Sequence, residues 1–222
     1  MSLIVKICGL KSAEAVDAAL DSGADMIGFV FFPPSPRNVA FDTARALSER
    51  VRGRALKVAL SVDANDALLR QIIESLAPDL LQLHGRESPD RVSAVRRRFG
   101  LPVMKALPIA EEADLAAIGA YEHQADRLIF DARAPREASR PGGLGRRFDW
   151  HLLRNIATAA PFMLSGGLDV DNVAEALRIT RAPGVDVSSG IERALGEKDP
   201  DRIRAFVAAA RRATEKQIAA SE

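Results

Sequence analysis

The sequence predicts a single-domain α/β protein, a closed (β/α)8 barrel of the TIM-barrel class. Eight short runs rich in apolar and β-branched residues alternate with about eight helical patterns along the chain. Such an alternation requires parallel strands joined by right-handed helical crossovers. Runs such as Leu80-Leu81-Gln82-Leu83 are nearly continuous in apolar residues, which is typical of strands covered on both faces. The length of 222 residues also fits, since such barrels often have about 200–250 residues.

The individual elements follow from periodicity and from turn residues. We expect the strands at 3–8, 25–32, 56–62, 79–84, 102–107, 127–131, 162–164 and 185–187. We expect the helices at 12–22, 42–51, 65–76, 89–99, 111–118, 149–157, 171–179 and 202–212. Ser12 is expected to cap the first helix and Gly23 to end it. The segment 33–37 holds three prolines and must form a stiff loop.

A doubly wound open sheet is the alternative fold. It usually has fewer strands, and the first turn here lacks the G-x-G-x-x-G pattern of a dinucleotide site. No linker, low-complexity tract or second domain interrupts the pattern. The domain is therefore expected to span residues 1–222, with the last residues from about 216 frayed.

Composition excludes several classes of protein. The single cysteine excludes an internal disulfide framework and a Cys-rich zinc site, and the three histidines show no metal-ligand spacing. The formal charge of +1 argues against nucleic-acid binding through a basic surface. No run is apolar enough to cross a bilayer, and the N-terminus lacks a secretory pattern, so we expect a cytoplasmic protein.

The only cysteine, Cys8, ends the first expected strand and precedes a glycine. In barrels of this kind the active site lies at the carboxyl ends of the strands, so a thiol at this point is a candidate for chemistry. The alternative is a small buried hydrophobe, which is the common role of a lone cysteine after a β-rich run.

Two glycine-containing turns follow the last two strands. Adjacent glycines allow backbone N–H groups to converge on an anion, and barrels commonly bind phosphate after strands seven and eight. We therefore expect a phosphate site that involves Gly166, Gly167, Ser189 and Gly190. Either turn alone could simply be a tight strand-to-helix connection.

Other strand ends carry ionisable side chains. Arg37, on the proline loop, could grip a carboxylate with two parallel hydrogen bonds, or it could be a solvated surface arginine. Asp131 closes an apolar strand, which would desolvate its carboxyl and favour the protonated form; Arg133 and Arg136 nearby would oppose this, and a capping or ion-pair role is the alternative. His84 could hydrogen-bond substrate or be a satisfied strand-end histidine.

The motifs in their order along the chain resemble those of the phosphoribosylanthranilate isomerase family. They are Lys6-Ile7-Cys8-Gly9-Leu10, Gly28-Phe29-Val30-Phe31 with Ser35-Pro36-Arg37, Gln82-Leu83-His84-Gly85, Gly142-Gly143-Leu144-Gly145 with Phe148-Asp149-Trp150, Ser165-Gly166-Gly167-Leu168 with Asn172-Val173, Asp186-Val187-Ser188-Ser189-Gly190-Ile191-Glu192, and Gly196-Glu197-Lys198-Asp199. The ordered set spans nearly the whole chain.

The resemblance implies an isomerase of tryptophan biosynthesis that acts on N-(5-phosphoribosyl)anthranilate by an Amadori rearrangement, without metal or cofactor, as a monomer or homodimer. It implies that Cys8 is the general base and Asp131 the general acid, that Arg37 binds the anthranilate carboxylate, and that the two turns bind the phosphate. The residues expected to bind substrate are Arg37, Gln82, His84, Gly166, Gly167, Asp186, Ser188, Ser189 and Gly190.

The implied chemistry needs an acid to open the ribose ring and a thiolate to remove the C2′ proton. A free thiol has a pKa of about 8.5, so Cys8 would need a positive neighbour. Lys6 shares its face of the strand by alternation, and we expect it to supply that charge.

Some residues depart from the family pattern. Ser165 stands where alanine is more common, Leu144 where threonine or asparagine is, and Leu60-Ser61-Val62-Asp63 is an unusual end to the third strand. We expect these departures to affect loop packing and ligand fit rather than the reaction.

Three other functions fit parts of the pattern. An enzyme of the indole-glycerol-phosphate synthase type also binds phosphate, but it uses lysine and glutamate at strand ends that here carry Cys8 and Asp131. A non-catalytic sensor of a phosphorylated ligand would need neither side chain. A thiol nucleophile would need a histidine partner, for which only His84 is at a strand end.

Overall fold

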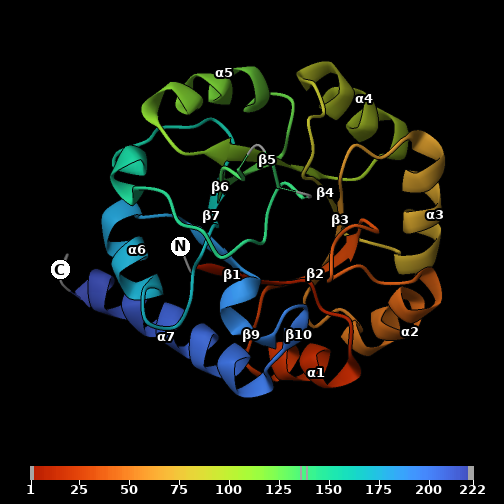
Figure 1. The fold of residues 1–222 in the computed structure, drawn as a ribbon, viewed down its shortest axis with the longest axis horizontal. Coiled ribbons are helices and arrows are strands. Elements are labelled where there is room, and N and C mark those ends of the chain that lie inside the picture. The colour runs from red at the N-terminus through yellow and green to blue at the C-terminus, as the bar shows by residue number, and fades with distance from the viewer. Residues whose placement is uncertain (1–2, 136, 139, 220–222) are drawn as a thin grey trace.

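Eight parallel strands form a closed barrel in sequence order, with β1 pairing to β8 to close it (Figure 1). The computed structural model describes residues 3–135, 137–138 and 140–219, without the side chains of 216–219. The strands are β1 (Ile4–Cys8), β2 (Met26–Phe31), β3 (Leu56–Ser61), β4 (Leu80–Leu83), β5 (Val103–Ile109), β6 (Arg127–Ala132), β7 (Phe162–Leu164) and β8 (Gly184–Val187). The predicted single-domain barrel is confirmed, and the open doubly wound sheet is excluded.

Helices surround the barrel (Figure 1). The described residues contain α1 (Ala13–Asp21), α2 (Phe41–Val51), α3 (Asp66–Leu76), α4 (Pro89–Phe99), α5 (Ile118–Tyr121), α6 (Val173–Thr180) and α7 (Pro200–Ala219), with 3-10 turns η1 (Glu112–Ala117), η2 (Trp150–Leu153) and η3 (Ser189–Ile191). Ser12 caps α1 as predicted, because its hydroxyl accepts a hydrogen bond from the amide of Ala15 at 3.3 Å. No helix among these residues is long and apolar enough to span a membrane.

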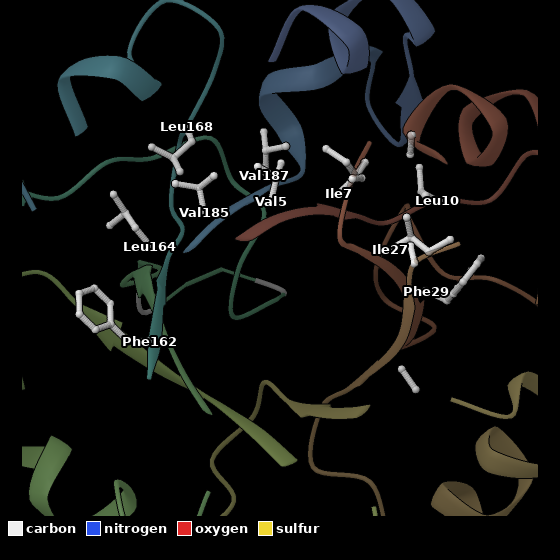
Figure 2. Close-up of a cluster of buried hydrophobic side chains, with 14 of the residues drawn as sticks. Val5, Ile7, Leu10, Ile27, Phe29, Phe162, Leu164, Leu168, Val185 and Val187 are labelled. Carbon is white, nitrogen blue, oxygen red and sulfur yellow. The ribbon is translucent and has the colours of Figure 1, made fainter. Parts of the chain in front are cut away.

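Strand alternation separates two apolar regions. One set of buried residues fills the barrel interior and includes Met26, Val58, Leu80, Met104, Ile129 and Met163. The larger set lies between the strands and the helices, where Figure 2 shows Val5 and Ile7 of β1. Since successive side chains of a strand point to opposite faces, Lys6 and Cys8 must face the interior. This alternation is what delivers polar side chains to the mouth of the barrel.

Two predicted helices differ in the structure. The helix expected at 149–157 is only the four-residue turn η2, because Arg154 is extended and Asn155 has φ of 63°. The apolar pair Trp150 and Leu153 is spaced as well for one 3-10 turn as for an α-helix. The helix expected at 111–118 is mostly 3-10, as η1, and becomes α-helical only in α5.

The C-terminal part also differs from the prediction. A hairpin of β9 (Glu192–Ala194) and β10 (Glu197–Lys198), which we did not predict, connects η3 to α7. The last helix was expected at 202–212 but α7 continues to Ala219, packing against α1 and α6. The fraying expected from about 216 concerns residues whose side chains are outside the described set, as are residues 220–222 altogether.

Candidate active site

A cleft of about 770 Å³, measured to its open mouth, lies at the carboxyl ends of the barrel strands. Residues from seven of the eight strand ends, all but that of β5, and from the loop after β6 line it. Among the predicted site residues, those that line it are Cys8, Arg37, His84, Asp131, Gly166, Gly167, Asp186, Ser188 and Ser189.

Cys8 ends β1 and is buried in the floor of this cleft. Gly28 of β2 lies against it, since a Cβ at that position would come within 3.0 Å of the Cys8 Sγ and 3.3 Å of the Lys6 Nζ. Burial raises the pKa of the Cys8 thiol, and the nearby ammonium groups of Lys6 and Lys198 lower it only in part. The prediction that Lys6 lies on the same face is confirmed, but the unliganded site favours the thiol over the thiolate.

The charge of Lys6, which favours the thiolate, is already paired. Its Nζ donates to the Oδ1 of Asp186 at 2.7 Å, and both side chains are buried. Burial lowers the pKa of Lys6, but Asp186 and Cys8 together outweigh this and the net direction is upward. Ser165 donates its hydroxyl proton to the other oxygen of Asp186 at 3.1 Å, so this departure from the family pattern adds a hydrogen bond inside the site.

Asp131 is joined to two residues of the predicted site. The Gln82 amide Nε2 donates to the His84 Nδ1 at 2.9 Å, so the Nε2 of a neutral ring carries the proton and donates to the Asp131 Oδ2 at 3.1 Å. The backbone amide of Ala132 donates to the other carboxylate oxygen. Gln82 is fully buried beneath His84 and is not among the residues that line the cleft.

Arg133 is one of the two arginines expected to oppose the protonation of Asp131. Its guanidinium pairs with Glu111 at 3.1 Å and also with Asp114, and its effect on Asp131 stays a prediction. Arg136 lies outside the described residues.

Arg37 is not a solvated surface residue, because only 3% of it is exposed. Its Nε and Nη2 donate to the two carboxylate oxygens of Glu192, at 2.6 and 2.8 Å, and its Nη1 donates to the Gly143 carbonyl at 3.1 Å. The same carboxylate accepts a hydrogen bond from the Nζ of Lys198 at 2.8 Å. Glu192 and Lys198 were missed as functional candidates, although both lie within the motifs that carried the family resemblance.

The two glycine turns lie in the same wall of the cleft. Gly166 and Gly167 have φ of 88° and 64°, a left-handed backbone that other residues rarely adopt. In the described part of the chain, the amides of Gly167, Ser189 and Gly190 donate to no protein acceptor. Gly190 does not line the cleft; its α-carbon faces the Leu168 carbonyl, where a Cβ would come within 2.0 Å. Its role in the structure is to let the two turns pack together.

The loop after β6 covers the cleft. A Cβ at Gly142 would lie 2.6 Å from both the Asp131 Oδ2 and the His84 Nε2, so the backbone rests directly on this pair. Leu144 lines the cleft with an apolar wall formed by Val30, Phe32, Leu60 and Val62. The unusual end of the third strand thus contributes two of the apolar side chains. No group of three or more metal-ligating side chains occurs among the described residues.

These features define a single-domain (β/α)8 barrel with a thiol and a carboxyl in one cleft at its carboxyl face. A model of the N-(5'-phosphoribosyl)anthranilate (PRA) isomerase family matches residues 5–209. The N-(5'-phosphoribosyl)anthranilate isomerase of Bradyrhizobium sp. (strain ORS 278) is 62% identical over 218 residues, which cover 98% of this chain and 100% of that protein. The chain therefore belongs to the phosphoribosylanthranilate isomerase family.

Solved structures agree with this assignment. The phosphoribosyl anthranilate isomerase of Thermotoga maritima matches with a TM-score of 0.84 at 32% identity, covering 94% of this chain and 98% of that one. A crystal structure of phosphoribosyl anthranilate isomerase in complex with reduced 1-(o-carboxyphenylamino)-1-deoxyribulose 5-phosphate also matches, with a TM-score of 0.80 at 30% identity, over 94% of this chain and 98% of that chain.

Proposed function

We propose that this protein converts N-(5-phosphoribosyl)anthranilate to 1-(2-carboxyphenylamino)-1-deoxyribulose 5-phosphate in tryptophan biosynthesis. The observation that carries the proposal is the content of one cleft: a thiol, a carboxyl, an arginine and two glycine turns with free amides. Each of these groups has a counterpart in the substrate, which has two anionic ends, an aromatic ring and a ribose. We expect the enzyme to act in the cytoplasm without a cofactor, as a monomer or homodimer.

The distribution of these groups fits the substrate. The turns at Gly166–Gly167 and Ser188–Ser189 would bind the phosphate through backbone N–H groups. The anthranilate ring would pack on the wall of Val30, Phe32 and Leu60, with its carboxylate toward Arg37. The ribose would then lie between Cys8 and Asp131, where the bonds are rearranged.

The reaction needs a proton at the ring oxygen first. Asp131, in its acid form, gives its proton to the ribose ring oxygen while the bond from that oxygen to C1′ breaks, and the nitrogen lone pair forms the iminium. The Cys8 thiolate then removes the C2′ proton, and the electron pair forms the C1′–C2′ double bond of the enolamine. To complete the cycle, the Cys8 thiol protonates C1′ and the Asp131 carboxylate takes the proton of the C2′ hydroxyl, which leaves the ketone.

The protonation state of Cys8 affects the second step. Burial raises the pKa of Cys8, so the thiol form predominates near neutral pH. The iminium formed in the first step is a cation, and a cation next to the sulfur favours the thiolate. We therefore propose that ring opening promotes loss of the thiol proton to solvent at the open mouth of the cleft, which prepares the base for the second step.

The test is turnover of N-(5-phosphoribosyl)anthranilate by the parent and by Asp131→Asn. We expect the parent to form the ketose and the variant to lose at least ~10²-fold in kcat, with unchanged folding by circular dichroism. Asp42→Asn, which changes an exposed carboxylate of α2 that does not line the cleft, is the control and should keep its activity. A folded parent that binds the substrate without turnover would instead indicate a non-catalytic binding protein for phosphorylated ligands.

A further inference from the structure

The Glu192 carboxylate is a buried charged group that the proposed reaction does not use. It lies at the start of β9, in the hairpin that follows β8. Its Oε1 accepts hydrogen bonds from Arg37 and Lys198, and its Oε2 accepts from Arg37 and from the Gly196 amide at 3.2 Å. Four donors thus fix the position of the carboxylate, so it can in turn restrain the side chains that donate to it.

What Glu192 holds is one edge of the Arg37 guanidinium. A guanidinium has five N–H donors in a plane. The bonds to Glu192 and to the Gly143 carbonyl use three of them, which leaves one N–H on each terminal nitrogen. Two N–H groups from different nitrogens are what a two-point contact with a carboxylate requires.

The stem of Arg37 is restrained as well. Gly9 follows Cys8 with φ of 80°, and a Cβ there would come within 2.8 Å of the Arg37 Cδ. The hairpin reaches the same loop, because a Cβ at Gly196 would lie 2.6 Å from the Pro36 carbonyl oxygen. The arginine is therefore confined by β1, by its own proline loop and by the hairpin.

Lys198 keeps this cluster cationic. Its Nζ donates to Glu192 at 2.8 Å and to the carbonyl of Ser188 at 2.8 Å. Burial lowers the pKa of Lys198 to about 8, with Glu192 opposing the decrease, so the ammonium is mostly charged at neutral pH. Two cations and one carboxylate leave a net positive charge near Arg37, which suits an anionic ligand.

We propose that Glu192 is the positioning residue for Arg37, and that the hairpin of β9 and β10 thereby determines the preference of the enzyme for substrates with a carboxylate on the aromatic ring. This inference rests on the proposed function. It adds that Arg37 alone is insufficient, because a long side chain without its support could adopt many conformations.

The experiment compares two substrates, N-(5-phosphoribosyl)anthranilate and N-(5-phosphoribosyl)aniline, which lacks the carboxylate. The measured quantity is the ratio of their kcat/KM values in the parent and in Glu192→Gln. We expect this ratio to fall by about tenfold or more, since hydrogen bonds to charged groups are worth about 1.5–3 kcal/mol and 1.4 kcal/mol is tenfold. The value for the aniline compound should change little, because its reaction does not use Arg37.

Glu197→Gln is the matched control, since it neutralises an exposed glutamate of the same hairpin. It should leave the ratio unchanged. If Glu192→Gln fails to fold, Glu192→Asp keeps the charge but withdraws it from Arg37, and the ratio should fall in the same way.

Equal losses for both substrates would show that Glu192 is merely structural, and an unchanged ratio would show that Arg37 needs no support. Either result would overturn this inference and leave the proposed function intact. A parent that converts neither compound would overturn the proposed function, and this inference with it.

Discussion

The Cys8 thiol is surrounded by charges that largely compensate one another. Lys6 and Lys198 favour the thiolate, while burial and the Asp186 carboxylate oppose it, and the net effect raises the pKa of the thiol. Because the pKa of the Cys8 thiol is raised, the thiolate becomes abundant only at a higher pH than for an ordinary cysteine. The rate of proton abstraction should follow it.

The first prediction concerns the pH dependence that results. In the parent, kcat/KM should rise with pH above neutrality as Cys8 ionises. Lys6→Met removes a cation and leaves Asp186 unpaired, and both changes disfavour the thiolate, so the rise should move to higher pH. A pH–rate profile for each protein is the measurement.

Stability must be controlled in this comparison. Breaking a buried ion pair on one side costs about 3–5 kcal/mol, so Lys6→Met should be assayed well below its melting temperature. The double variant Lys6→Met/Asp186→Asn removes the unpaired charge and should recover part of the shift. Superimposable profiles for the parent and Lys6→Met would remove Lys6 from any role in tuning the thiol.

The second prediction concerns Gly142, whose backbone rests on Asp131 and His84. An added methyl group must displace one of these side chains, and displacements of about 1 Å in an active site can cost ~10²-fold in rate. We therefore expect Gly142→Ala to lower kcat by about 10- to 100-fold. Gly119→Ala, where a Cβ would contact nothing within 4 Å, should have wild-type kinetics. Equal kinetics for both variants would contradict the close packing at Gly142.

The sequence identified some residues of the cleft and missed others. The strand-end rule found Cys8 and Asp131, because both follow directly from their place on a strand. It did not find Glu192, whose bond with Arg37 joins residues 155 positions apart. It also left open whether Arg37 was solvated, since burial depends on packing that no local pattern records.

At the scale of elements, the loop after β6 is the segment that completes the site. Gly142 contacts the Asp131–His84 pair, Gly143 accepts a hydrogen bond from Arg37, and Arg147 lies against Gly167 of the phosphate turn. The loop thus contacts Asp131, which is the expected general acid, Arg37, which is expected to bind the substrate carboxylate, and the expected phosphate site. Three glycines within residues 142–145 favour a mobile loop, and we predict that this loop acts as a lid.

The third prediction tests that movement. Ligand should hold the loop on the cleft, so the amides of residues 142–147 should exchange more slowly with solvent when inorganic phosphate or the reduced product analogue is added. Hydrogen exchange with mass detection is the measurement, and α3, which is remote from the cleft, is the internal control. No change in the protection of 142–147 would show that the loop is not a lid.

Helices that begin at a capping side chain were predicted well from the sequence. Ser12 caps α1 through its side chain as predicted, and the structure shows that Asn65 and Ser88 cap α3 and α4 in the same way. The helix expected at 149–157 failed because the left-handed Asn155 ends the turn, and asparagine is only one of several residues that adopt this conformation. The β9–β10 hairpin was missed because its strands have only three and two residues.

For the whole molecule, eight alternating units were sufficient to predict closure. The count of strands determines the barrel, and the barrel determines which strand ends meet. Charged pairs buried on the outer side of the strands could not be predicted. Lys105 of β5 donates to Glu87 at 2.8 Å and to the Gly85 carbonyl at 2.7 Å, and both side chains are almost inaccessible.

The fourth prediction is that this pair supports the fold and not the reaction. Lys105→Met leaves Glu87 buried and unpaired, so the free energy of unfolding should fall by about 3–5 kcal/mol, while kcat stays unchanged below the melting temperature. Lys105→Met/Glu87→Gln should recover part of the loss. Urea denaturation with parallel assays is the measurement, and a loss of kcat in a folded Lys105→Met would contradict the separation of fold and site.

The central claim is that Cys8 removes the C2′ proton of phosphoribosylanthranilate. Steady-state turnover by Cys8→Ala, at about pH 8 and beside the parent, tests it most directly. We predict a loss of at least ~10²-fold in kcat in a variant that is folded and still binds phosphate, since the thiol is the base but not a ligand of the substrate. Turnover that survives the substitution would contradict the claim and assign the proton transfer to another group of the cleft.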